Sequence, residues 1–221
     1  MPDFDLVIRN ARIVDGTGTP WYRGDVAVRD GKIEHVGVLS SGVPCASEID
    51  AGGEVLAPGF VDMHTHNDFL LLKDAETVPK LRQGVTTIMI GQCGISAAPI
   101  EGDKVPLLDA YTGFVKAGVK PEWNWRSFAE YLDVLDGLDL GVNVGSFVGH
   151  GTIRLNVLGF EDRLPTAEEL GKMRNLAHTA MEEGAFGMTS GLIYPPGVYS
   201  TSEEVEEIAR GLKDRQGLYL S

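Results

Sequence analysis

The stretch GFVDMHTHND (Gly59–Asp68) decides how the chain is organised, because the sequence pattern changes there. Residues 1–56 contain short apolar runs separated by turns and no long helical pattern. From Pro58 onward, short apolar runs alternate with amphipathic helices, which is typical of parallel strands covered by helices. The sequence therefore predicts two parts: a small all-β portion at residues 1–56 and an α/β portion at residues 57–221.

The all-β portion is expected to contain a β-hairpin. Apolar runs at residues 25–29 and 32–38 flank Asp30-Gly31, a dipeptide that favours a two-residue turn with positive φ. Residues 6–14 predict a further strand.

The α/β portion has a regular order of strand and helix signals. Strands are expected at residues 59–63, 85–90, 141–148, 185–190 and 217–220. Apolar stripes between them predict three helices, with stripes running over residues 128–135, 170–181 and 205–212. Gly137 and Gly184 can end the first two helices. Thr166 and Glu169 fit a capping box at the start of the second helix, and Ser202 is a plausible cap for the third.

Two α/β architectures remain after this step, a closed barrel and an open doubly wound sheet. Neither G-x-G-x-x-G nor G-x-x-x-x-G-K-[ST] follows the first strand, so the usual evidence for a nucleotide-binding open sheet is absent. A (β/α)₈ barrel needs about 250 residues. Residues 57–221 hold about five βα units of such a barrel.

Polar side chains follow the first two of these strands, where the carboxyl ends of parallel strands form one face. His64 and His66 are spaced so that both imidazoles can reach one ion, and Asp62 could orient an imidazole as a hydrogen-bond acceptor. Cys93, in GQCG, would add a thiolate, a strong ligand for Zn²⁺. The alternatives are two solvated histidines in a loop and a cysteine packed in the core.

The third and fourth strands also lead into segments that could line a site. GHGTIR carries His150 and Arg154 in an expected glycine-rich loop, and SGLIYPPGVYS carries Tyr194 before two prolines. Such loops can position substrate groups. Equally, His150 could hydrogen-bond to the backbone and Tyr194 could pack with its hydroxyl in water.

Composition excludes several classes of function. The net charge is −13 and no basic stripe is present, which argues against nucleic acids and anionic membranes as partners and favours a small molecule. No run of about 18 uncharged apolar residues exists, and the N-terminus is not basic, so a cytoplasmic protein is expected. The two cysteines, Cys45 and Cys93, are expected to be free thiols.

The combined motifs resemble a known family. APGFVDMHTHND, GVTTIMIGQCG, SFVGHGTIR and GMTSGLIYPPGVYS are similar to the D-aminoacylase branch of the amidohydrolase superfamily, the N-acyl-D-amino-acid deacylases. The resemblance covers the whole chain. It implies a small β-sandwich and a metal-dependent (β/α)₈ barrel that hydrolyses the amide bond of N-acyl-D-amino acids, giving a D-amino acid and a carboxylate.

The resemblance also implies roles for individual residues. His64, His66 and Cys93 would hold one or two Zn²⁺ ions, with Mn²⁺ or Co²⁺ as other possibilities, and Tyr194 would contact the substrate. His150, placed after the third strand, is a further candidate for substrate binding. The family's general-base aspartate is expected beyond Ser221, so the 221-residue chain alone is expected to be an inactive, truncated portion of such an enzyme. The alternative enzyme class is a cyclic-amide hydrolase of the hydantoinase or dihydroorotase type, which a lysine at the end of the fourth strand would favour; GMTSGLIY has none.

Overall fold

The computed structural model describes residues 3–221, and the chain forms two compact units, Met1–Gly59 and Phe60–Ser221. Each unit has its own sheet system and its own buried cluster of apolar side chains. No helix within residues 3–221 is both long enough and apolar enough to cross a lipid bilayer.

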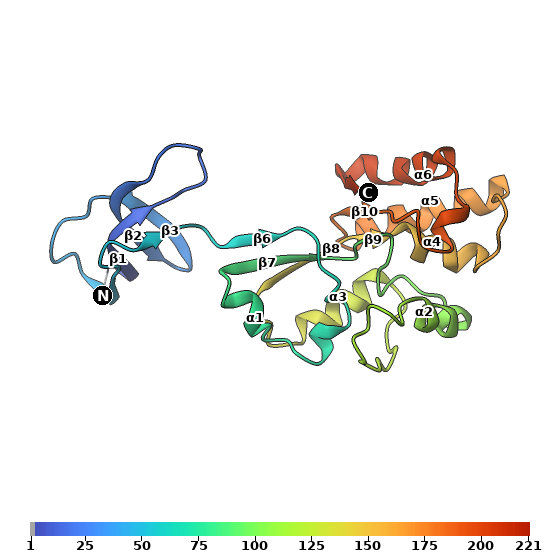
Figure 1. Ribbon diagram of the computed structural model, residues 1–221, viewed down its shortest axis with the longest axis horizontal. Helices are drawn as coiled ribbons and strands as arrows, with labels where there is room; N and C mark the ends of the chain where they lie inside the picture. The colour runs from blue at the N-terminus through green and yellow to red at the C-terminus, as the bar shows by residue number, and fades with distance from the viewer. Residues whose placement is uncertain (1–2) are drawn as a thin grey trace. The chain divides into compact units, whose positions relative to one another are not determined.

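The first unit is a five-stranded sheet in the order β3-β2-β1-β4, with β5 also paired to β1 (Figure 1). Its strands are β1 (Phe4–Ile13), β2 (Tyr22–Arg29), β3 (Lys32–Gly37), β4 (Cys45–Asp50) and β5 (Val55–Leu56). Asp30 and Gly31 both have positive φ, 50° and 70°, and Arg29 lies opposite Lys32. The hairpin predicted at Asp30-Gly31 is therefore confirmed. Strands β4 and β5 run parallel to β1, and the sequence analysis did not predict them as separate strands.

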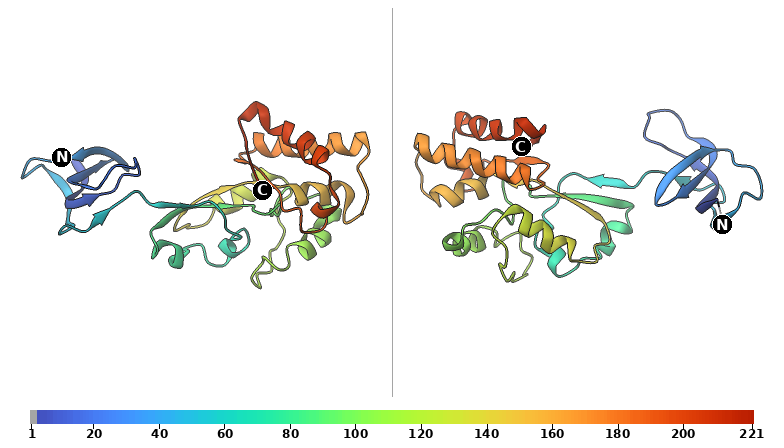
Figure 2. Two further views of the ribbon diagram at one scale, coloured as in Figure 1. Left: turned by 45° about the horizontal axis from the view of Figure 1, so that its top comes forward. Right: turned by 180° about the vertical axis from the view of Figure 1, so that it is seen from behind.

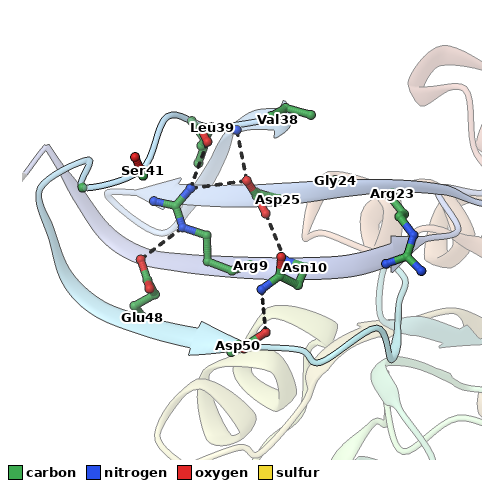
Figure 3. A pocket seen from close by; sticks show the side chains of 11 residues that line it. Arg9, Asn10, Arg23, Gly24, Asp25, Val38, Leu39, Ser41, Glu48 and Asp50 are labelled. Carbon is green, nitrogen blue, oxygen red and sulfur yellow. Dashed lines mark hydrogen bonds and ion pairs between the residues drawn. The ribbon is translucent and has the colours of Figure 1, made fainter.

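A polar network joins three strands of this sheet and lines a surface pocket (Figure 3). The Arg9 guanidinium contacts Asp25 Oδ2 at 3.3 Å and Glu48 Oε2 at 3.1 Å. The Asp25 carboxylate also accepts hydrogen bonds from the backbone amides of Asn10 and Leu39, each at 3.0 Å. Burial opposes ionisation, but these donors outweigh it and hold the pKa of Asp25 below its usual value. The network thus fixes the segment after β3 against β1 and β2.

In the second unit all strand pairs are parallel, as the sequence predicted. One sheet has the order β6-β7-β8 and the other β11-β10-β9. The strands are β6 (Phe60–Asp62), β7 (Val85–Ile90), β8 (Asn143–Ser146), β9 (Val148–Gly149), β10 (Gly187–Thr189) and β11 (Leu218–Leu220). Strands β6, β7 and β8 lie side by side in both views of Figure 2.

The single strand expected at residues 141–148 is wrong, because Phe147 divides it into β8 and β9. Strand β8 pairs with β7, and β9 pairs with β10. The Phe147 amide donates to Ile90 O at 3.0 Å, and the Phe186 amide donates to Ser146 O at 2.9 Å. Parallel segments therefore follow one another in chain order from β6 to β11.

Helices cover these strands, and α5 packs against both α4 and α6 (Figure 1). The helices are α1 (Val78–Leu81), α2 (Val105–Tyr111), α3 (Phe128–Asp136), α4 (His150–Leu158), α5 (Ala167–Glu182) and α6 (Ser202–Ala209). Short 3₁₀ turns are η1 (Leu70–Leu72), η2 (Gly102–Lys104), η3 (Gly197–Tyr199) and η4 (Arg210–Arg215). The core contains buried side chains from β7, β9, β10 and helices α2 to α6.

The helix starts agree with the expectations in one case and differ in two. The capping box of α5 is confirmed: the Glu169 amide donates to Thr166 Oγ1, and the Thr166 amide donates to Glu169 Oε2. Helix α6 is capped by Thr201, so the assignment of Ser202 as its cap is wrong. The glycine-rich loop expected at GHGTIR is also wrong, because Gly149 is the N-cap of α4 and residues 150–154 form the start of this helix.

Candidate metal centre

His64 and His66 lie in the segment that follows β6, and local hydrogen bonds fix the backbone around them. The His64 amide donates to Asp62 Oδ1 at 3.2 Å, and the Thr65 amide donates to Met89 O of β7 at 3.2 Å. The buried Thr65 side chain anchors the segment. The two imidazole rings have centroids 5.6 Å apart at an interplanar angle of 72°, so both rings point to the same region.

Cys93 lies in a tight turn after β7. It has a φ of 56°, in the left-handed region that non-glycine residues rarely adopt, between Gly91 at 75° and Gly94 at 74°. A Cβ atom on Gly91 would lie 2.0 Å from Phe147 O, so only glycine fits there. The close approach of this turn to the neighbouring backbone directs Cys93 toward the histidines.

The structure brings His64, His66 and Cys93 together. One donor atom from each lies within 4.8 Å of the others, and Cys93 Sγ is 3.2 Å from His64 Nε2. Zn²⁺ bonds to nitrogen at about 2.0–2.1 Å and to sulfur at about 2.3 Å, so atoms bound to one ion lie on the order of 3–4 Å apart. The three side chains fit such an ion with small side-chain movements. Their role as ligands stays a prediction.

Burial changes the pKa of two of the three candidate ligands. Burial raises the pKa of the Cys93 thiol, and burial, followed by the nearby His64, lowers the pKa of His66. The lowered pKa favours the neutral imidazole of His66, and its buried Nδ1 has no hydrogen-bond partner within residues 3–221. A bound cation would favour the thiolate form of Cys93. It would also provide a partner for the imidazole of His66.

Asp62 does not orient an imidazole. Its carboxylate accepts from the His64 backbone amide and forms an ion pair with Lys80. The hydrogen bond from Lys80, more than that from His64, holds the pKa of Asp62 below its usual value. The expected interaction with a histidine side chain is thus replaced by one with the backbone of the same histidine.

Asp68 was not among the candidate residues, although it is one of the most buried polar groups near the site. Its Oδ1 accepts from the Gly91 amide at 2.9 Å, and its Oδ2 has no hydrogen-bond partner in the part of the chain that the structure describes. Burial raises the pKa of Asp68 to about 7. The Tyr131 hydroxyl of α3 donates to its backbone oxygen at 2.7 Å. The sequence signal was its place two residues after His66, next to the first metal motif.

His150, a candidate for substrate contact, is fully buried at the start of α4. Its Nε2 lies 3.1 Å from Glu204 Oε1 of α6, and Arg154 forms an ion pair with the other oxygen of Glu204. Arg154 Nη2 also donates to Arg163 O at 2.6 Å. Sequence reasoning missed Glu204, which is about fifty residues away in the chain. Contact of His150 with a substrate stays a prediction, and the structure gives this side chain a buried ionic partner.

Tyr194 is partly exposed in the segment after β10. Its ring packs against Phe114, with centroids 5.6 Å apart and an interplanar angle of 32°. Phe114, in the segment after α2, was not a candidate in the sequence, because an isolated aromatic residue outside a periodic pattern carries no signal.

Comparison with known proteins assigns the chain to a family. The model of the Amidohydrolase family matches residues 47–218. The chain therefore belongs to the amidohydrolase family. Within that family the chain is similar to D-aminoacylases and related deacylases.

The similarity to individual proteins is extensive over this chain. D-aminoacylase of Alcaligenes xylosoxydans xylosoxydans is 40% identical over 220 residues, which are 98% of this chain and 43% of the relative. N-acyl-D-glutamate deacylase of the same organism is 34% identical over 98% of this chain and 43% of the relative. The chain thus spans less than half the length of the curated relatives it matches.

Solved structures give the same assignment. A crystal structure of D-aminoacylase matches with a TM-score of 0.84 and 37% identity, over 98% of this chain and 44% of that one. N-acyl-D-glutamate deacylase from Bordetella bronchiseptica, complexed with zinc and a phosphonate mimic of the tetrahedral intermediate, matches with a TM-score of 0.85 and 34% identity over the same shares. L-hydantoinase from Arthrobacter aurescens, at 21% identity and a TM-score of 0.60, shares the fold.

Proposed function

We propose that the protein hydrolyses the amide bond of N-acyl-D-amino acids in a Zn²⁺-dependent reaction, giving a D-amino acid and a carboxylate. The observation that carries this proposal is the convergence of His64, His66 and Cys93 at the ends of β6 and β7. Relatives of this chain include D-aminoacylase and deacylases for N-acyl-D-aspartate and N-acyl-D-glutamate, and one similar structure contains zinc.

The architecture that supports this activity is proposed on the same grounds. Residues 57–221 would supply five consecutive βα units of a (β/α)₈ barrel, and residues 1–56 would supply part of a small β-sandwich. The parallel strands β6 to β11 in chain order support the barrel. The five-stranded sheet of the first unit would be one layer of that sandwich.

His64, His66 and Cys93 would hold the ion. When bound, Zn²⁺ supplies Lewis-acid polarisation of the amide carbonyl and lowers the pKa of a coordinated water. Cys93 would be present as a thiolate and His66 as a neutral imidazole, which are the protonation states that bind a cation. The hydroxyl of Tyr194 would donate a hydrogen bond to the substrate. The buried side chain of His150 would be the second residue that contributes to substrate binding.

A cyclic-amide hydrolase is the other enzyme class that shares this fold. The similarity to L-hydantoinase, at 21% identity, supports the fold alone. The segment at the end of β10 reads Thr189-Ser190-Gly191 and offers no lysine that could be carboxylated to bridge two ions. The cysteine ligand at the end of β7 favours the linear-amide class.

The proposal is tested on the full-length gene product with a panel of N-acetyl-D-amino acids, their L enantiomers and cyclic amides. We expect bound Zn²⁺ by elemental analysis and hydrolysis of the D substrates. His64→Ala and Cys93→Ala should each lower Zn²⁺ binding and reduce kcat/KM at least about 100-fold, because each removes a direct metal ligand.

His178→Ala is the matched control. This histidine lies on α5, with its side chain 40% exposed and paired with Glu182, away from the three candidate ligands. Its replacement should leave metal content and activity at the wild-type level. A gene product without bound metal whose activity survives His64→Ala, or one that hydrolyses only cyclic amides, would contradict the proposal.

A further inference from the structure

The turn that carries Cys93 is closed by one hydroxyl group from a distant strand. Thr189, on β10, donates from Oγ1 to Gly91 O at 2.5 Å and accepts at the same atom from the Gly94 amide at 3.0 Å. These two backbone groups lie on either side of Gln92-Cys93. A single side chain, about one hundred residues away in the sequence, therefore bridges both ends of the turn.

We infer that Thr189 is a positioning residue for the metal centre: its hydroxyl presets the Cys93 sulfur toward the two histidines. The inference rests on the proposed metal-dependent function, because it concerns how the thiolate ligand is held. The two hydrogen bonds of the Thr189 hydroxyl go to the backbone of the turn. Its effect is transmitted through the backbone of the turn.

The shape of the turn explains why it needs such a bridge. Gly91, Cys93 and Gly94 all have φ between 56° and 75°, and for cysteine this conformation costs free energy. A turn with a strained non-glycine residue persists only where the surroundings determine it. The Thr189 hydroxyl is almost completely buried, at 1% exposure of the residue, so water cannot replace either hydrogen bond.

The direction of both hydrogen bonds is unambiguous. A carbonyl oxygen only accepts and a backbone amide only donates, so the one hydroxyl must donate to Gly91 and accept from Gly94. Serine preserves this arrangement, and valine, which has nearly the same shape as threonine, removes it. The chain thus offers a matched pair of substitutions at one position.

Two further contacts bind the same turn to the histidine segment. The Gln92 side chain donates to Met63 O at 2.8 Å, directly before His64, and Asp68 accepts from the Gly91 amide at 2.9 Å. Asp68, in the segment that carries His64, therefore accepts a hydrogen bond from the Cys93 turn. Gln92, in the turn, donates a hydrogen bond to the backbone of that segment. The two hydrogen bonds of Thr189 connect the same turn to β10.

The backbone after β10 also lies directly on the turn. A Cβ atom on Gly191 would lie 2.2 Å from Cys93 O. If the Cys93 turn shifted toward Gly191, its backbone would collide with the segment that leads to Tyr194. The contact explains why β10 is the element that positions the turn.

The test measures Zn²⁺ affinity of the full-length gene product by chelator competition, for wild type, Thr189→Val and Thr189→Ser. Loss of a side chain that orients a metal ligand typically costs 10- to 100-fold in metal affinity. We expect Thr189→Val to bind Zn²⁺ about 10- to 100-fold more weakly, and Thr189→Ser to bind within about threefold of wild type. The Co²⁺-substituted proteins provide a second readout, because the sulfur-to-cobalt charge-transfer absorption should weaken or shift in Thr189→Val and be restored in Thr189→Ser.

The outcomes separate this inference from the proposed function. A wild-type protein that binds no metal would overturn the proposed function. A wild type and a folded Thr189→Val that bind Zn²⁺ equally tightly, with identical Co²⁺ spectra, would overturn the role of Thr189 alone. If Thr189→Val does not fold, Thr189→Ala, which introduces no additional methyl group, is measured against Thr189→Ser by the same two readouts, and equal affinity would again overturn the inference.

Discussion

Glu204 is a buried carboxylate held between His150 and Arg154, with an exposed fraction of 3% for the residue. Burial raises the pKa of this carboxyl, but the hydrogen bonds from His150 and Arg154 outweigh it and hold the pKa below the usual 4.5. The residue joins the start of α4 to the first turn of α6. Neither its burial nor its partners could be read from the sequence, where EEVEE has the composition of a solvated helix face.

Glu204→Gln should lower the free energy of unfolding at pH 7 by about 3–5 kcal/mol, because it leaves the Arg154 guanidinium buried without a counter-ion. The folded-state pKa is lower than the unfolded-state pKa, so the carboxylate stabilises the fold above about pH 4.5 and loses this contribution as the pH falls through the folded pKa. Denaturant unfolding at several pH values measures the difference, which should shrink below pH 4.5.

Glu206→Gln is the control for this substitution. Glu206 lies on the same helix, and its exposed carboxylate contacts Arg210. Such a surface pair contributes about 0–1 kcal/mol, so this variant should remain close to wild type at every pH. A Glu204→Gln protein as stable as Glu206→Gln would show that the buried ion pair does not stabilise α4 and α6.

At the scale of helices, the predictable features are those set by neighbours in the sequence. Helix α5 begins with Thr166 and Glu169 bonded reciprocally, as their spacing indicated. Helix α3 has an equivalent capping box at Ser127 and Glu130, which follows the same rule. Helix α4 gave no periodic signal because eight of its nine residues are buried. A helix surrounded by protein has no polar face, and so no amphipathic pattern.

Thr201→Ala should destabilise the protein by about 1 kcal/mol, because the Thr201 hydroxyl accepts a hydrogen bond from the Glu204 amide at the start of α6. Ser202→Ala should have an effect within about 0.5 kcal/mol, since Ser202 is already the first helical residue and alanine favours helix. Thermal unfolding of the two variants side by side tests the assignment. A larger loss of stability for Ser202→Ala than for Thr201→Ala would show that Ser202 is the cap.

For the molecule as a whole, the candidate metal centre links elements that are distant in the sequence. His64 after β6, Cys93 after β7 and Thr189 at the end of β10 meet there. In the native protein a bound ion would therefore stabilise several strands at once, because it binds the folded state and not the separated segments.

Metal removal should lower the thermal stability of the full-length gene product. An ion present at 100 times its dissociation constant stabilises the folded state by about 2.7 kcal/mol, so a chelator should lower Tm and added Zn²⁺ should restore it. Differential scanning calorimetry measures both changes. The His178→Ala protein should respond as wild type does, and His64→Ala should respond less. An unchanged Tm after complete removal of the metal would contradict a structural contribution of the ion.

Local chemistry in the sequence determined the hairpin turn and the capping box of α5, and it selected the candidate metal ligands. Asp30-Gly31 fixed a hairpin because both residues adopt positive φ, and the alternation of strands and helices after Pro58 indicated an α/β unit because parallel strands need connecting helices. His64, His66 and Cys93 were selected as one candidate group because strand ends of parallel units lie on one face.

Only the tertiary structure decided what depends on residues far apart in the chain. It divided residues 141–148 into β8 and β9, buried His150 against Glu204, and brought Thr189 to both ends of the Cys93 turn. The physical reason is that these interactions are between groups about fifty to one hundred residues apart, whose hydrogen bonds and burial exist only once the strands have assembled. Local propensity carries no information about such partners.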